Sequence, residues 1–138
     1  MSRMLKIALS KYGQKEVLGT SHNPEIVNFA KEAGFPVEED ETAWCSIFIN
    51  WAAFKAGCER SKRMDARSWL KVGTPVTLPD VGDVVVFKRG DSDWQGHVGL
   101  FISQIGDKIY VLGGNQSNMV NIAPYTVSDL LGYRRIEW

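Results

Sequence analysis

Cys45 is placed where a cysteine can act as a nucleophile. It lies near the start of an apolar run that predicts a helix over 43–56, with Thr42 as a candidate cap and Gly57 at its end. The first turn of a helix has unpaired N–H groups and a positive dipole end, which favour a thiolate and can stabilise an oxyanion. We therefore expect a partly exposed Cys45 with a lowered pKa. A small buried hydrophobic residue is the alternative interpretation.

His97 is the candidate base for Cys45. It opens a predicted strand over 97–103, and the alternation of side chains puts His97, Gly99 and Phe101 on one face. A base for Cys45 should bring a ring nitrogen within about 3–4 Å of Sγ, whereas a structural histidine need not. His22, the other histidine, precedes a predicted helix start, and a solvated loop position explains it fully.

A third group should hold the imidazole in the required tautomer, as asparagine does in papain-like sites. Asn115 is the first candidate, because it follows the predicted strand that pairs with the His97 strand. A turn role is the alternative for Asn115, and Gln116 could orient the ring instead. The histidines and the two distant cysteines show no zinc-ligand spacing, so neither a metal nor a cofactor is expected.

Helical patterns fill the first half of the chain and strand patterns the second half, which predicts one α+β domain over residues 1–138. The expected helices cover 2–12, 24–34, 43–56 and, briefly, 66–70, and the expected strands cover 83–88, 97–103, 108–112, 118–123 and 131–136. The helix over 43–56 would separate Cys45 from Cys58 by roughly 20 Å, too far for a disulfide.

Charge and hydropathy argue against some classes of binding partner and against a membrane-spanning segment. Sixteen basic and sixteen acidic residues cancel, which removes the main electrostatic argument for binding nucleic acid or an anionic membrane. No stretch has the apolar length of a signal peptide or of a membrane span. We expect synthesis in the cytoplasm, with another export route for any work outside it.

Two strand motifs resemble those of a known superfamily. Gly82-Asp-Val-Val-Val-Phe87, a loop, and then Gly96-His-Val-Gly-Leu-Phe-Ile102 are similar to the signature of NlpC-type and CHAP cell-wall hydrolases, in which the nucleophilic cysteine begins a central helix. The resemblance runs from about Ala8 to Arg135. Further motifs resemble a compact subgroup of bacterial and phage peptidoglycan hydrolases: Asp40–Cys45, Asn50-Trp51, Ala66–Leu70, Gly113–Gln116 and Leu131–Arg135.

The resemblance implies a papain-like fold, in which a central cysteine-bearing helix packs on an antiparallel sheet of about five strands. It implies Cys45 as nucleophile, His97 as general base and Asn115 as orienting group, with no cofactor. The expected partner is the peptidoglycan stem peptide. The candidate substrate-binding residues are Trp44, Trp94 and Gln116, with Trp69 as a further candidate.

The resemblance leaves the cleaved amide open between the muramoyl–L-alanine bond, a bond within the stem such as D-glutamyl to diaminopimelate, and a cross-link. With no signal peptide expected, a phage lysin, a tail-associated lysin or an injected effector is favoured over a housekeeping enzyme. The protein would act on the wall after release, with an immunity or delivery protein as a candidate partner. Two alternatives are a catalytically silent module that binds wall peptide, and a cysteine deamidase or transglutaminase-like effector acting on protein.

Overall fold

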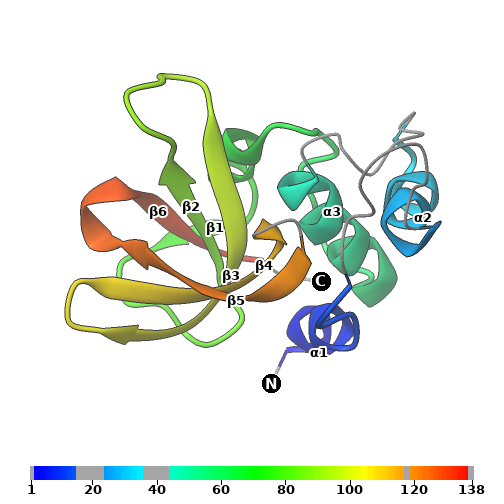
Figure 1. Cartoon of the computed structure of the whole chain (residues 1–138), viewed down its shortest axis with the longest axis horizontal. Helices are drawn as coiled ribbons and strands as arrows, with labels where there is room; N and C mark the ends of the chain where they lie inside the picture. Colours follow the sequence, from blue (N-terminus) through cyan, green and yellow to red (C-terminus); the bar gives the residue numbers. More distant parts are fainter. Residues whose placement is uncertain (1, 15–23, 36–43, 117–118, 137–138) are drawn as a thin grey trace.

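The computed structural model describes residues 2–14, 24–35, 44–116 and 119–136. The α-helices precede the strands, as the sequence predicts (Figure 1). The helices are α1 (Arg3–Leu9), α2 (Pro24–Ala33), α3 (Cys45–Ala56) and the 3-10 helices η1 (Ala66–Lys71) and η2 (Val127–Asp129). The strands are β1 (Thr74–Val76), β2 (Val84–Lys88), β3 (Gly96–Ile105), β4 (Lys108–Gln116), β5 (Met119–Thr126) and β6 (Leu130–Arg135).

The described strands form one antiparallel sheet of six strands in the order β1-β6-β2-β3-β4-β5. Five were expected from the sequence, and β1 is the additional one. It is a three-residue edge strand with Pro75 at its centre, and a proline without an N–H fits only an edge. The Gly and Pro around it gave no period-2 pattern, so the sequence predicted a loop there.

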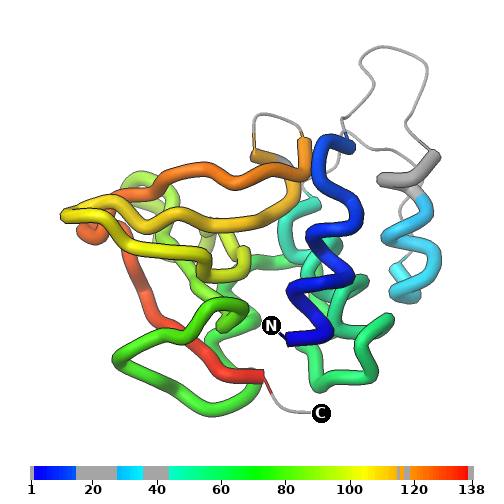
Figure 2. Tube along the Cα trace, turned by 90° about the horizontal axis from the view of Figure 1, so that it is seen from below, coloured from blue at the N-terminus to red at the C-terminus, as the bar shows by residue number. Residues whose placement is uncertain are grey.

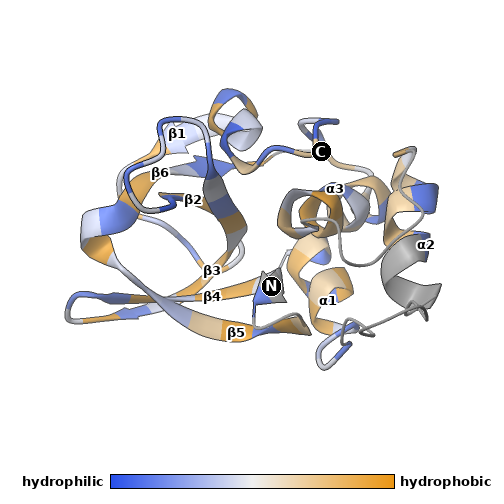
Figure 3. Ribbon diagram, turned by 45° about the horizontal axis from the view of Figure 1, so that its top comes forward, coloured by the Kyte–Doolittle hydropathy of each residue, from blue (hydrophilic) through white to orange (hydrophobic). Residues whose placement is uncertain are grey.

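α3 lies between the sheet and α2, and α1 packs beside it (Figure 1). Figure 3 shows apolar residues on α1 and α3. One core cluster joins these helices to Val84, Val98 and Leu100 on the near face of the sheet. A second cluster, which includes Phe101, occupies the opposite face. Adjacent β3 residues thus alternate between the two cores, as predicted.

The two ends of the described chain lie on the same side of the molecule (Figure 2). Ser2 and Ile136 line one surface cleft together. Ser2 caps α1, since its side chain accepts a hydrogen bond of 3.1 Å from the Leu5 N–H. No helix in the described ranges is long and apolar enough to cross a bilayer.

α3 begins at Cys45, with Trp44 at the N-cap position and no side-chain cap. Thr42, the expected cap, lies outside the described residues. The C-terminal prediction is confirmed: Gly57 ends the helix in the left-handed region at φ 74°, where glycine is favoured. α3 is almost wholly buried, which agrees with the near absence of polar residues in its sequence.

Candidate active site

Cys45 is the first residue of α3, so its N–H and the Ser46 N–H precede the first hydrogen bond of the helix, from the Phe48 N–H to the Trp44 carbonyl. The side chain is only 5% exposed. This corrects the expectation of a partly exposed thiol. The helix N-terminus was predicted, but the surrounding packing that covers Sγ comes from distant parts of the chain.

Gln116 fixes the tautomer of His97. The His97 Nε2 lies 2.8 Å from the Gln116 Oε1. The Gln116 amide nitrogen lies 3.2 Å from the Val111 carbonyl, 2.7 Å from the Asn121 carbonyl and 2.8 Å from the Asn121 Oδ1. Three acceptors around this nitrogen require the oxygen of the amide to face His97. An oxygen acceptor requires a proton on Nε2, so the neutral ring has its lone pair on Nδ1.

The His97 ring is held by stacking as well as by this hydrogen bond. Its centroid lies 4.7 Å from that of Tyr125 at an interplanar angle of 15°. Tyr125 stacks in turn on Phe87 at 4.8 Å. His97 is 3% exposed. A ring held along one edge and across one face has little rotational freedom, so the Nδ1 direction is defined before substrate binds.

Two glycines make room for this arrangement. A Cβ on Gly113 would lie 2.8 Å from the Gln116 Oε1 and 3.3 Å from the His97 Nε2. A Cβ on Gly114 would lie 2.6 Å from Cζ3 of the Trp44 ring. The Gly113–Gln116 segment also contains an irregularity in the β4–β5 pairing. The two glycines of this segment thus lie against His97 and against Trp44, the residue that precedes Cys45.

The thiol and the imidazole are both held in their neutral forms. Burial raises the pKa of Cys45, opposed by the Val98 N–H, the positive charge of Arg89 and the N–H groups at the start of α3. Burial lowers the pKa of His97 to about 4, opposed by the Gln116 hydrogen bond and reinforced by Arg89. The sequence-based expectation of a lowered Cys45 pKa is thus wrong, because burial outweighs the helix N-terminus.

The Val98 N–H links Cys45 to β3, because it faces the thiol and lowers its pKa. Val98 is the neighbour of His97 in the same strand. Among the described residues, His97 hydrogen-bonds to Gln116 and not to Cys45. No hydrogen bond joins Sγ to the ring among the described residues, and the expected distance of about 3–4 Å between them stays a prediction. Catalytic hydrogen bonds are often long without substrate, so the roles of the two residues stay predictions.

A cleft of about 170 Å³ opens onto Cys45. Its lining includes Met64, Asp65, Arg89, Trp94 and Gln95. Trp94 is 68% exposed, so it can contact a bound molecule. Arg89, the residue after β2, has no ion-pair partner among the described residues and contributes an unbalanced positive charge.

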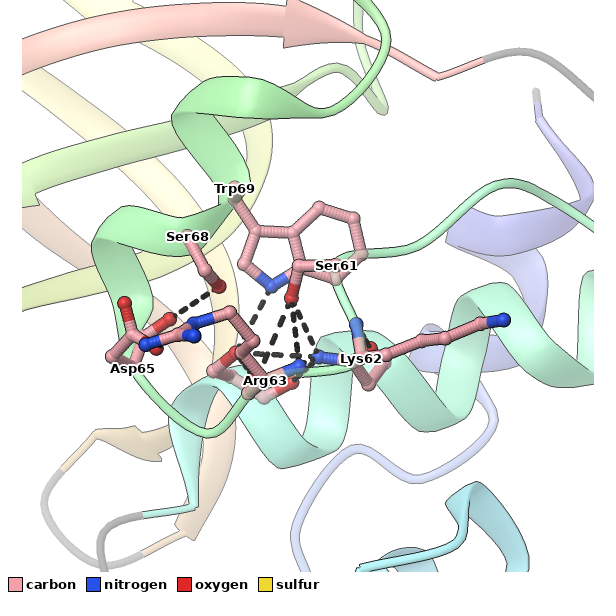
Figure 4. Close-up of polar contacts among 8 residues, drawn as sticks. Ser61, Lys62, Arg63, Asp65, Ser68 and Trp69 are labelled. Atoms are coloured by element: carbon pink, nitrogen blue, oxygen red, sulfur yellow. Dashed lines mark hydrogen bonds and ion pairs between the residues drawn. The ribbon is translucent and has the colours of Figure 1, made fainter.

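Buried polar groups of α3 bond to the loop that forms one wall of this cleft, and Figure 4 shows the polar contacts of that loop. The Ser46 hydroxyl donates to the Arg63 carbonyl at 2.7 Å and accepts from the Trp69 Nε1 at 3.0 Å. The Asn50 Oδ1 accepts from the Lys62 N–H at 2.7 Å. These bonds satisfy buried polar atoms of Ser46 and Asn50 and fix the loop that carries Met64 and Asp65.

Arg67 holds the opposite wall. Its guanidinium donates to the Gln95 carbonyl at 2.9 Å and to the Ser92 carbonyl at 2.7 Å. These two contacts position the loop that carries Trp94 beside Cys45. Arg67 lies in the Ala66–Leu70 motif, so the motif supplies a support for the cleft.

The other residues that the sequence predicted for the site have different outcomes in the structure. Trp44 and Trp69, at 1% and 0% exposed, lie in the core, which corrects their expected place in a substrate groove. Gln116 is 3% exposed and bonded to His97, so its side chain lies buried against the ring and is not on the surface. The side chain of Asn115 and the whole of His22 lie outside the described residues.

Sequence reasoning missed Arg89, Tyr125 and the segment around Met64 and Asp65. Arg89 follows an apolar strand and precedes Gly90, a position that marks a strand end but not a cleft. Tyr125 lies in β5, and only the sheet order brings it to His97. No group of three or more potential metal-ligating His, Cys, Asp or Glu residues occurs in the described part of the chain.

Comparisons with known proteins agree with this architecture. The family model described as "CHAP domain" matches residues 37–115, which is more than half of the chain. The fold is similar to a solved structure described as "similar to lipoprotein, NLP/P60 family" from Staphylococcus aureus subsp. aureus Mu50, with a TM-score of 0.55 and 19% identity. That match covers 96% of this chain and 40% of the other. A search of curated proteins found no match.

Proposed function

We propose that this chain, which belongs to the CHAP domain family, hydrolyses an amide bond in the peptide of peptidoglycan through a cysteine acyl-enzyme. CHAP domains are usually amidases or peptidases, and the family points to a peptidoglycan-related substrate. One observation carries the assignment of roles: Gln116 leaves the His97 Nδ1 lone pair free, in a ring next to the residue whose N–H faces the Cys45 thiol.

Because both groups are neutral, the proton must move during the attack. As Cys45 Sγ bonds to the carbonyl carbon, His97 Nδ1 takes the thiol proton and the carbonyl oxygen becomes an oxyanion. The N–H groups of Cys45, Ser46 and Val98 each lower the pKa of the Cys45 thiol, so they lie close to Sγ. They are therefore the candidate donors of hydrogen bonds to the oxyanion. The Gln116 oxygen stabilises the imidazolium that forms, since it accepts from Nε2.

In the second half of the reaction the thiol proton passes to the leaving amine, and a proton from water replaces it. His97 Nδ1–H protonates the amine nitrogen as its bond to carbon breaks, leaving a thioester on Cys45. Water then attacks the thioester carbon and gives a proton to Nδ1. The carbon–sulfur bond breaks, and the thiolate recovers the proton from the imidazolium. The products are a carboxylic acid and an amine, and no cofactor takes part.

Digestion of purified peptidoglycan tests this proposal. The wild-type protein should release soluble fragments, and mass spectrometry of the new termini should identify the cleaved bond. Cys45→Ala and His97→Ala should release almost nothing, with Cys58→Ala as a matched control that keeps full activity. Fragments released equally by Cys45→Ala and by the wild type would contradict the cysteine mechanism.

The burial of Cys45 favours a second candidate function, a silent module that binds wall peptide. A thiol that is 5% exposed and whose pKa is raised reacts slowly unless substrate binding opens the cleft. Peptidoglycan that sediments with the wild-type protein but is never cut would favour this module. Deamidation of a protein glutamine without release of wall fragments would favour a protein-directed effector.

A further inference from the structure

A second cleft, of about 530 Å³, lies beside the Cys45 cleft. Asp65 lines both clefts, so they share a wall. We call the second one the basic cleft, because its charged lining residues are Glu59, Arg60, Arg63, Asp65, Arg67 and Lys71. Its volume is in the range of small-ligand sites.

The basic cleft concentrates positive charge, although the net charge of the whole chain is zero. Four cations face two carboxylates in its lining, whereas the whole chain holds sixteen residues of each sign. Arg63 pairs with Asp65 at 2.7 Å, and these two charges cancel. Glu59 accepts a hydrogen bond of 3.0 Å from the Gly73 N–H, which holds this carboxylate at one end.

The remaining cations are not neutralised by carboxylates. Arg67 uses its guanidinium on two backbone carbonyls, which orient it but leave its charge unbalanced. Arg60 donates to the Ala33 carbonyl at 3.0 Å and lies over the Phe54 ring at 5.4 Å. Lys71 ends η1 and has no hydrogen-bond or ion-pair partner among the described residues. A cleft of this kind favours an anion of more than one charge.

From these contacts we infer that the basic cleft is a subsite that binds carboxylates of the substrate peptide beside the bond to be cut. The identity of this ligand rests on the proposed function, since wall peptides carry free carboxylates within a few residues of each amide. Arg67 supports the loop that carries Trp94 in the Cys45 cleft and also lines the basic cleft. One peptide can therefore lie across both clefts.

Binding to the Cys45→Ala variant of the full chain tests the inference without turnover. Isothermal titration should compare one synthetic stem peptide with free carboxylates and the same peptide with these groups amidated. The free acid should bind about fivefold more tightly, the size of effect expected for one exposed ion pair. Lys71→Gln, made in the Cys45→Ala background, should remove most of this preference.

Lys88→Gln is the matched control, because Lys88 is also exposed and lines neither cleft. It should leave both affinities unchanged. Equal affinity for the acid and the amidated peptide, or equal effects of Lys71→Gln and Lys88→Gln, would overturn the inference. If glycerol phosphate competes in a Lys71-dependent manner while the two peptides bind alike, the cleft serves a phosphate and the assignment to peptide carboxylates is wrong.

Cleavage by the wild-type protein separates this inference from the proposed function. If both peptides are cut with equal kcat/KM and Lys71→Gln changes neither, hydrolysis stands and the carboxylate subsite falls. If the acid binds in a Lys71-dependent manner and no peptide is cut, the subsite stands and the proposed hydrolysis falls.

Discussion

Gln116→Ala should reduce kcat far more than Asn115→Ala, although the two residues are neighbours in β4. The substitution removes the acceptor 2.8 Å from His97 Nε2 and so the group that fixes the proton on that nitrogen. A buried hydrogen bond to a group that becomes charged is worth about 1.5–3 kcal/mol, or roughly 10- to 150-fold in rate. Asn115→Ala should stay within about threefold of the wild type, since Gln116 already supplies the acceptor for His97 Nε2.

The assay is the rate of cleavage of a soluble stem peptide, read by mass spectrometry, together with the melting temperature of each variant. Gln116→Ala also leaves three acceptors on Val111 and Asn121 without the amide, so it should destabilise the fold by about 1–3 kcal/mol. Rates must therefore be compared well below the melting temperature. A Gln116→Ala variant that melts earlier but keeps its kcat would refute the orienting role, as would a larger kcat loss in Asn115→Ala.

Four further outcomes follow from the geometry. The free energy of unfolding should fall between pH 6.5 and about 4, since the unfolded chain there protonates a histidine that the fold holds neutral, and His97→Gln should flatten this slope in acid-dependent urea melts. Iodoacetamide at pH 6 should modify Cys45 no faster than Cys58, which is the less buried thiol, and faster labelling of Cys45 would show a stabilised thiolate. Trp94→Ala should raise KM by about fivefold and leave the melting temperature unchanged, whereas Ile105→Ala, at the same 68% exposure, should change neither. Gly114→Ala should lower both activity and melting temperature because its Cβ would lie 2.6 Å from the Trp44 ring, and Gly132→Ala, with 3.4 Å to Leu70, is the tolerated control.

The predictable parts of the fold are those in which apolar residues follow the period of a helix or a strand. The apolar run of α3, its end at Gly57 and the alternation of His97 and Val98 between two cores all follow from local pattern. β1 was missed because three residues around a proline carry no such pattern. β4 was predicted to end at Leu112, but it continues through Gly113 and Gly114. In the sequence these glycines resemble a turn, and only the structure shows that they leave space for Gln116, His97 and Trp44.

The ambiguity between Asn115 and Gln116 was of a kind that sequence cannot resolve. Consecutive strand residues point to opposite faces, so a one-residue irregularity exchanges which of them meets the neighbouring strand. The β4–β5 pairing shifts between Gly113 and Gln116, and with that shift Gln116 reaches His97. Trp44 was misplaced for a related reason: its neighbour Cys45 suggested a groove, but the space beside Gly114 receives the indole ring in the core.

Burial, more than the helix N-terminus, decides how this cysteine could react. The same packing that raises the pKa of Cys45 lowers that of His97, so an ion pair between them is disfavoured before substrate arrives. A neutral pair has no pre-formed thiolate, and its reactivity depends on where the proton can go. Gln116 settles that question by occupying Nε2, which leaves Nδ1 as the acceptor. Under the proposed mechanism, Gln116 therefore matters more to the reactivity of Cys45 than the dipole of the helix that carries Cys45 does.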